Sequence, residues 1–195
     1  MHTMVIRWEG DAQVLVRKVG RAAIRTGRRT DATAMYQGVT QPSPETTVHR
    51  WTIGGGWVAE ARLVFDREAA CTYLSVQSPE PEMESQVFAW FGERLQAVPV
   101  AELLDQARRT GDRDPQAYLR LALGVGSSTS GEVRQLLADS LRAEEPARRR
   151  GAALAVGLLR WPELLGDVAS ALEDEPDAAN RALLTVAYRE MVANG

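Results

Sequence analysis

The chain has 195 residues, 45% hydrophobic and 25% charged, which is enough for one domain or two small ones with a packed core. Its formal net charge of −3 argues mildly against a dedicated nucleic-acid binder, because phosphate contacts need a concentrated positive face. No apolar run is long enough to span a membrane, no signal-peptide pattern opens the chain, and a lone cysteine excludes intramolecular disulfides, so we expect a cytoplasmic protein without a membrane partner.

The first 30 residues contain a short strand and an ambiguous segment. Residues 4–8 are β-prone and predict a strand. Residues 11–29 carry an apolar stripe at helical spacing, with Asp11 as the N-cap and Gly27 as the stop. The same segment can also be interpreted as strands that Gly20 interrupts. The length of the stripe favours the helix.

Positive charge is concentrated in this segment. The basic side chains opposite the apolar stripe are Arg17, Lys18, Arg21, Arg25 and Arg28. One interpretation is a solvated helix face, which is the usual fate of such a run. The other is a docking patch for an acidic ligand, either a protein or a nucleic acid.

The middle of the N-terminal half predicts a meander of antiparallel strands. Residues 37–45 contain one glycine and two prolines and predict a loop. Residues 46–53 and 57–65 flank Gly54-Gly55-Gly56, which is a hairpin signature because glycine supplies the positive φ angles of a tight turn. Residues 71–76 predict a third strand of this meander.

A second helix is predicted at residues 82–96, and its apolar side chains cover more than half of its circumference. A helix of that kind is buried from more than one side. We therefore expect it to be the linking helix that ends a small α+β domain at residues 1–97. Residues 98–195 have no strand signal and predict a separate all-α domain.

A repeat organises the C-terminal half. Pro115, Pro146 and Pro176 stand 31 and 30 residues apart, and each follows an acidic residue. Proline is favoured at the first position of a helix, where its missing N–H would be unpaired anyway. The helix between the first two prolines opens with a capping box from Thr129 to Glu132. A fixed period of this size is typical of stacked helical pairs.

Residues 98–193 resemble HEAT-like repeats of the short bacterial type first noted in phycobilin lyases. The resemblance is carried by the acid-proline openings, the Arg148-Arg149-Arg150 first turn, the Ala-Leu core and the period. It implies an all-α, HEAT-like domain of three helical pairs and a bacterial source. It implies little about activity, because related arrays bind proteins, bind nucleic acids or assist cofactor attachment.

Few residues offer catalytic chemistry. Cys71 and His49 would form a nucleophile and base if neighbouring strands brought them together, but no third, orienting group is visible. The two histidines and one cysteine have no metal-ligand spacing. We therefore expect a non-enzymatic protein without a metal or cofactor.

We predict a protein–protein interaction module, such as an adaptor, an immunity-type inhibitor or an accessory subunit. The partner-binding residues expected on the helical repeat are Arg148, Arg149, Trp161, Leu184, Tyr188 and Met191. A nucleic-acid-binding protein that uses the two arginine-rich patches is the alternative. The last helix carries more apolar surface than a terminal repeat needs, so it can also support a homodimer.

Overall fold

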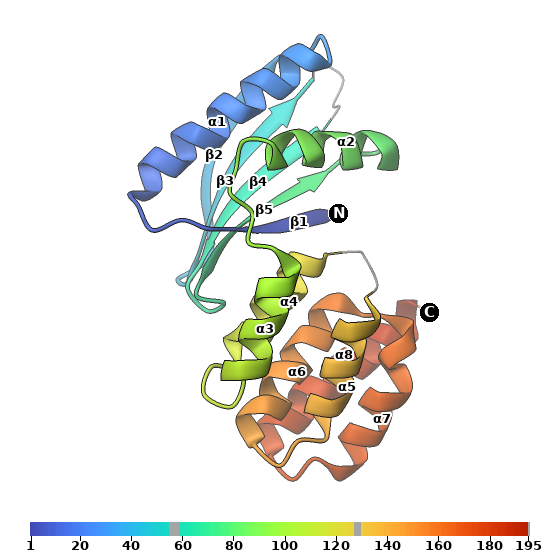
Figure 1. Ribbon diagram of the computed structural model, residues 1–195. Helices are drawn as coiled ribbons and strands as arrows, with labels where there is room; N and C mark the ends of the chain where they lie inside the picture. The colour runs from blue at the N-terminus through green and yellow to red at the C-terminus, as the bar shows by residue number, and fades with distance from the viewer. Residues whose placement is uncertain (55–58, 127–129, 195) are drawn as a thin grey trace. The chain divides into compact units, whose positions relative to one another are not determined.

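The computed structural model describes residues 1–54, 59–126 and 130–194 (Figure 1). The chain forms two compact units, Met1–Val98 and Pro99–Gly195, here called the N-terminal and the C-terminal unit. The first contains an antiparallel sheet and two helices, and the second is helical throughout its regular structure. The predicted α+β fold class is therefore confirmed.

Five antiparallel strands form the sheet of the N-terminal unit. They are β1 (His2–Ile6), β2 (Ala34–Ser43), β3 (Thr46–Ile53), β4 (Ala59–Asp66) and β5 (Cys71–Gln77), in the order β1-β5-β4-β3-β2. The predicted meander is confirmed as β3, β4 and β5. Gly55 and Gly56 of the predicted glycine turn, and the first two residues of the predicted strand at 57–65, lie outside the described residues. β1 and β2 extend the meander at its two edges.

The predicted loop at residues 37–45 is wrong, because most of it belongs to β2. Gly38 has a φ of 106° and follows a register irregularity after Tyr36. A second irregularity between Thr40 and Ser43 accommodates Pro42. An edge strand tolerates both residues, since proline there needs no neighbour for the N–H that it lacks and a bulge absorbs the extra backbone.

Two helices, α1 (Ala12–Arg29) and α2 (Pro81–Gly92), cover one face of the sheet and share one apolar core with it (Figure 1). The helical interpretation of residues 11–29 is confirmed, and Asp11 Oδ1 accepts a hydrogen bond from the N–H of Gln13 at 2.6 Å, as expected of an N-cap. The helix runs two residues beyond Gly27, the stop that the sequence predicts, because Thr30 caps it instead.

The C-terminal unit consists of three helical pairs, as predicted. The helices are α3 (Val100–Thr110), α4 (Gln116–Val125), α5 (Gly131–Leu141), α6 (Pro146–Leu159), α7 (Leu165–Asp174) and α8 (Ala178–Asn194), with a short 3₁₀ turn, η1 (Pro162–Leu164), before α7. Within each pair the two helices pack together, and α4, α6 and α8 also pack one against the next. Thr129, half of the predicted capping box, lies outside the described residues.

The prolines open the second helices at slightly different positions. Pro115 directly precedes α4, Pro146 is the first residue of α6, and Pro176 stands two residues before α8. In α8 the N-terminal hydrogen bond comes from Asp177, whose Oδ1 accepts from the N–H of Asn180 at 2.9 Å. Proline thus lies at or next to the start of α4 and α6 as predicted, whereas α8 is capped by Asp177 and not by Glu175, the acidic residue before Pro176.

Tyr118 joins several helices of the C-terminal unit. Its ring is fully buried, and its hydroxyl shares a hydrogen bond of 2.8 Å with the Ser140 hydroxyl in α5. The ring packs directly on Gly151 of α6, where an added Cβ would lie 2.5 Å from Tyr118 Cδ2. Gly111, just after α3, faces the same ring. Two glycines therefore make room for one aromatic side chain.

Candidate functional site: the groove between α1 and β2

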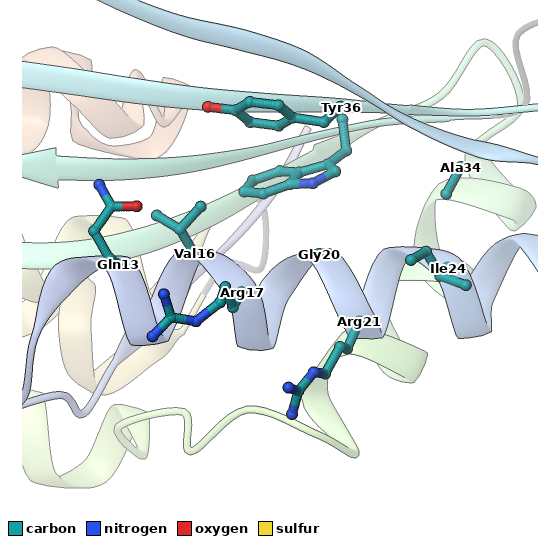
Figure 2. Close-up of a pocket in the computed structure, with 9 residues that line it drawn as sticks. Gln13, Val16, Arg17, Gly20, Arg21, Ile24, Ala34 and Tyr36 are labelled. Carbon is teal, nitrogen blue, oxygen red and sulfur yellow. The ribbon is translucent and has the colours of Figure 1, made fainter.

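A groove of about 430 Å³ lies in the N-terminal unit between α1 and the strands β2 and β3 (Figure 2). Six of its lining residues come from α1 and three from the strands. They are Gln13, Val16, Arg17, Gly20, Arg21 and Ile24 of the helix, and Ala34, Tyr36 and Trp51 of the strands. Apolar and cationic groups therefore share one concave surface.

The floor of the groove is made by Trp51 of β3 and Gly20 of α1. Trp51 is buried in the core, and a Cβ at position 20 would lie 3.4 Å from its Nε1. The helix backbone at Gly20 therefore lies close to the indole edge, at a distance where a Cβ would just reach ordinary van der Waals contact.

The helix side of the groove carries two of the predicted basic residues. Arg17 and Arg21 are exposed and line the groove, whereas Arg25 and Arg28 are exposed but do not line it. Lys18 lies over the Trp8 ring, with its Nζ 5.9 Å from the ring centroid. The predicted patch is therefore divided, and two of its members line the groove.

The end of α1 is fixed to the segment after α2. Arg29 donates two hydrogen bonds to the Glu93 carboxylate, at 3.1 and 2.8 Å, and its guanidinium lies 5.3 Å from the Trp90 ring centroid. The ion pair holds the pKa of Glu93 below its ordinary value. These contacts hold the helix that supplies Arg17 and Arg21 in a defined position.

The strand side of the groove is aromatic. Tyr36 is 51% exposed and stands on β2 opposite Trp51 of β3, with their ring centroids 5.3 Å apart. The Tyr36 hydroxyl shares a hydrogen bond of 2.8 Å with His49 Nδ1. Burial lowers the pKa of His49 below its ordinary value. His49 is therefore a neutral hydrogen-bonding partner of Tyr36 near neutral pH.

The two edges of the sheet differ. Along β1, the N–H of Arg7 donates to the carbonyl of Gln96 at 2.8 Å, and the N–H of Val98 donates to the carbonyl of Val5 at 2.8 Å. The chain that follows α2 thus covers the β1 edge. Among the described residues no segment pairs with the outer edge of β2. The open edge of the sheet is therefore the strand that borders the groove.

The residues predicted to bind a partner on the last two repeats are mostly buried. Trp161, Leu184 and Met191 are 5%, 1% and 5% exposed, and Tyr188 is only partly exposed. The prediction is corrected for the three buried residues, because their side chains pack inside the unit. The large apolar side chains that α8 exposes in the described part of the chain are Val186 and Val192.

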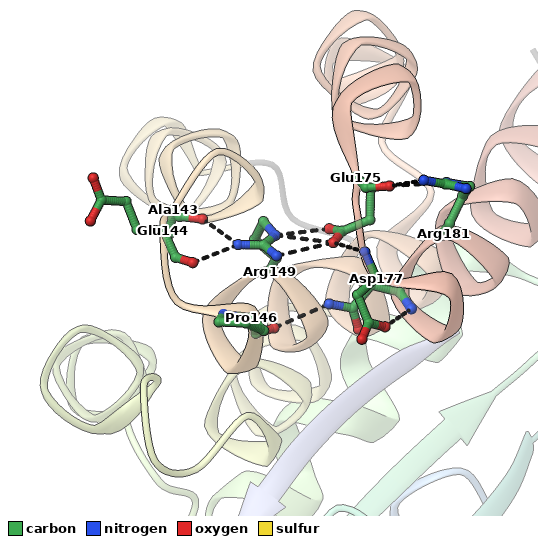
Figure 3. A network of polar contacts seen from close by, with 8 residues as sticks. Ala143, Glu144, Pro146, Arg149, Glu175, Asp177 and Arg181 are labelled. Atoms are coloured by element: carbon green, nitrogen blue, oxygen red, sulfur yellow. Dashed lines mark hydrogen bonds and ion pairs between the residues drawn. The ribbon is translucent and has the colours of Figure 1, made fainter.

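Arg149, another predicted contact residue, belongs to an internal network (Figure 3). Its Nε donates to Glu175 Oε2 at 2.9 Å, and a terminal nitrogen donates to the carbonyls of Ala143 and Glu144 at 2.9 and 2.7 Å. The side chains of Arg149 and Glu175 are 12% and 1% exposed. The prediction that Arg149 contacts a partner is therefore corrected, since its donors hold the start of α6 to the segment before α8.

Arg148 belongs to the same second arginine patch (Arg148, Arg149 and Arg150) and is engaged as well. Arg148 is half-buried, and one of its terminal nitrogens donates to the carbonyl of Arg108 at 3.1 Å. Together with the Arg149 network, this contact engages two of the three arginines of the second patch within the unit, while Arg150 is exposed.

The sheet register separates the two residues considered for nucleophilic chemistry. His49 pairs with Leu63 on β4, while Cys71 pairs with Asp66, an odd number of residues further along that strand. Because side chains alternate between the faces of a strand, His49 and Cys71 lie on opposite faces.

Residues 1–54, 59–126 and 130–194 contain no group of three or more His, Cys, Asp or Glu side chains placed to hold a metal ion. In the described part of the chain, no helix is both long and apolar enough to cross a bilayer.

No protein-family model, curated protein or solved structure matches this chain. The resemblance of the C-terminal unit to HEAT-like repeats therefore stays a prediction.

Proposed function

We propose that this protein is a non-enzymatic interaction module that binds an acidic, partly apolar segment of another protein in the groove between α1 and β2. The observation that carries the proposal is the pairing of Arg17 and Arg21 with an exposed aromatic and aliphatic wall in one groove. Arginine forks bind carboxylates in two-point contacts, and apolar lining provides the contact area that gives such a site affinity.

A protein partner fits this site better than a nucleic acid. A nucleic-acid surface needs many phosphate contacts, whereas two arginines line the groove and two of the three arginines of the second patch are engaged within the fold. The chain as a whole is negative. The C-terminal unit, which we regard as a HEAT-like array, supplies a rigid second body in this proposal rather than the main contact.

Photo-crosslinking tests the proposed site. A photoreactive amino acid replaces Ile24, which lines the groove and is 48% exposed, or Val14, which is 42% exposed on the same helix but does not line it. We expect a protein adduct from position 24 in the producing cells and little from position 14. The adduct should be lost in a variant that also carries Arg17→Glu and Arg21→Glu.

Equal adducts from both positions would show that contact is not specific to the groove. An adduct with nucleic acid instead of protein would support the alternative function.

A further inference from the structure

We propose that the bound segment is an extended acidic peptide that adds to the sheet as a sixth strand along β2. The inference rests on the proposed function and specifies how the groove is used. Strand addition joins a peptide to an exposed sheet edge through main-chain hydrogen bonds, while side-chain sites beside that edge select the sequence.

The open edge of β2 is the first support. Natural sheets protect their edges with charged residues, bulges, proline or a covering segment. The β1 edge has such a cover in residues 96–98. β2 has no charged residue between Ala34 and Ser43, and its irregularities and proline lie beyond Tyr36. Its first three residues thus form a regular and unguarded edge.

The hydrogen-bonding groups of this part of β2 point outward at alternate residues. Gly54 N–H donates to the Thr33 carbonyl at 2.9 Å, which marks residues 33 and 54 as a hydrogen-bonded pair. In an antiparallel ladder the next residues along the strand alternate between inward and outward bonding. Ala34 and Tyr36 therefore direct their N–H and carbonyl groups toward the open side, where an added strand would lie about 4.8 Å away.

The groove supplies selectivity at the same place. Ala34 and Tyr36 are the two β2 residues that line it, and Val16, Arg17 and Arg21 line it from α1. Figure 2 shows Val16 extending from the helix toward the strand that carries Tyr36. Side chains of an added strand on this face would thus lie beside an apolar surface and near the exposed Arg17 and Arg21, whose long side chains extend away from the strands in Figure 2. A peptide strand whose alternate residues are acidic or aliphatic would present these side chains on the face that lies toward that surface.

A second copy of this chain fits the edge less well than an acidic peptide. The neighbouring strand in such a dimer would be another β2, which carries no acidic residue. Arg17 and Arg21 of the two copies would then lie near the same interface, and β2 has no carboxylate to neutralise their charge. Charge complementarity therefore favours an acidic partner segment over self-pairing.

Hydrogen exchange of the full-length protein, followed amide by amide, tests strand addition. The probe is a synthetic ten-residue peptide, the length of β2, in which threonine alternates with glutamate and valine. The matched control has the same side chains but N-methyl groups on alternate amides, which removes strand hydrogen bonds without changing charge. We expect the unmodified peptide to slow exchange at Ala34 and Tyr36, and the methylated peptide to lose binding.

Three results would overturn strand addition. Main-chain pairing requires the methylated peptide to lose binding, so equal affinity for both peptides contradicts it. Binding that leaves the exchange of Ala34 and Tyr36 unchanged does the same, and a crosslink from Ile24 would then still support the proposed function. If the exchange of Ala34 and Tyr36 is slowed without peptide, and slows further as the protein concentration rises, then the β2 edge pairs with a second copy of this chain. If position 24 forms no crosslink to a protein, the proposed function itself is contradicted.

Discussion

At the scale of single residues, the packing of Tyr118 gives a sharp prediction. Gly151→Ala places a Cβ 2.5 Å from Tyr118 Cδ2 and 2.8 Å from the Pro115 carbonyl oxygen. Relieving that overlap requires the buried ring or the backbone to move, and overpacking of this kind costs about 1–3 kcal/mol. We expect the free energy of unfolding to fall by that amount in urea titrations.

Gly157→Ala is the matched control, because it lies in the same helix. Its added Cβ meets only Ala187 Cβ, at an ordinary 3.7 Å. Helix propensity alone then applies, which favours alanine by up to about 1 kcal/mol. A Gly151→Ala variant as stable as Gly157→Ala would contradict the packing described for Tyr118.

The Arg149–Glu175 pair gives a second prediction at this scale. Glu175 also accepts a hydrogen bond from the N–H of Asp177 at 3.1 Å, and its carbonyl accepts from Arg181 Nε at 2.9 Å (Figure 3). Arg149→Met leaves the buried carboxylate without its cation, a change that costs about 3–5 kcal/mol. We expect a loss of that size in thermal or urea unfolding.

A double-mutant cycle separates the pair from simple loss of volume. Arg149→Met combined with Glu175→Leu removes both charges, so the double variant should be less destabilised than the sum of the two single variants. Additive losses would mean that the two side chains act independently.

At the scale of elements, the sheet around His49 should respond to pH. His49 packs against Trp51 and edge-on against Phe65, and burial lowers its pKa in the folded state. The unfolded chain therefore binds more protons between the folded and the ordinary pKa, and unfolding becomes easier as the pH falls through that window. We expect lower thermal stability at pH 5.5 than at pH 7.5.

His49→Gln should flatten this pH dependence while removing some stability at pH 7.5, because it also alters the hydrogen bond with Tyr36. An unchanged slope between the two pH values would mean that His49 does not titrate differently on unfolding.

The helices were largely predictable from the sequence, and the groove was not. Proline, acidic caps and helical spacing are local signals, so α1 and the three helical pairs follow from them. β2 was missed because Gly38 and Pro42 resemble loop residues, and only pairing with β3 turns them into irregularities of an edge strand. The β-prone Met35 and Tyr36 before Gly38 are the signal that points to this strand.

The predicted contact residues on the C-terminal unit failed for a related reason. Trp161, Leu184 and Met191 are apolar at helical spacing, which does not distinguish a row packed on its own pair from a row that faces outward. Arg149 looked like free positive charge because its partner, Glu175, lies 26 residues away along the chain. Such choices depend on contacts between distant segments.

At the scale of the whole molecule, a negative chain carries a local positive groove. The net charge of −3 opposes acidic partners at long range, while Arg17 and Arg21 attract them at short range. Salt screens exposed charges over about 8–10 Å, so affinity for the acidic peptide should fall as the salt concentration rises. Titrations at low and high salt check this, and salt-independent affinity would mean that apolar contact alone drives binding.

The central claim is that Arg17 and Arg21 bind acidic side chains in the α1–β2 groove. Replacing these arginines by glutamate tests it most directly. Peptide affinity is measured for Arg17→Glu/Arg21→Glu and for the control Arg25→Glu/Arg28→Glu, which makes the same change in net charge on the same helix outside the groove lining. We predict that the groove variant loses about tenfold or more in affinity for the glutamate peptide and gains affinity for a lysine version, while the control changes little. Equal effects of the two variants, or no gain with the lysine peptide, would contradict the claim.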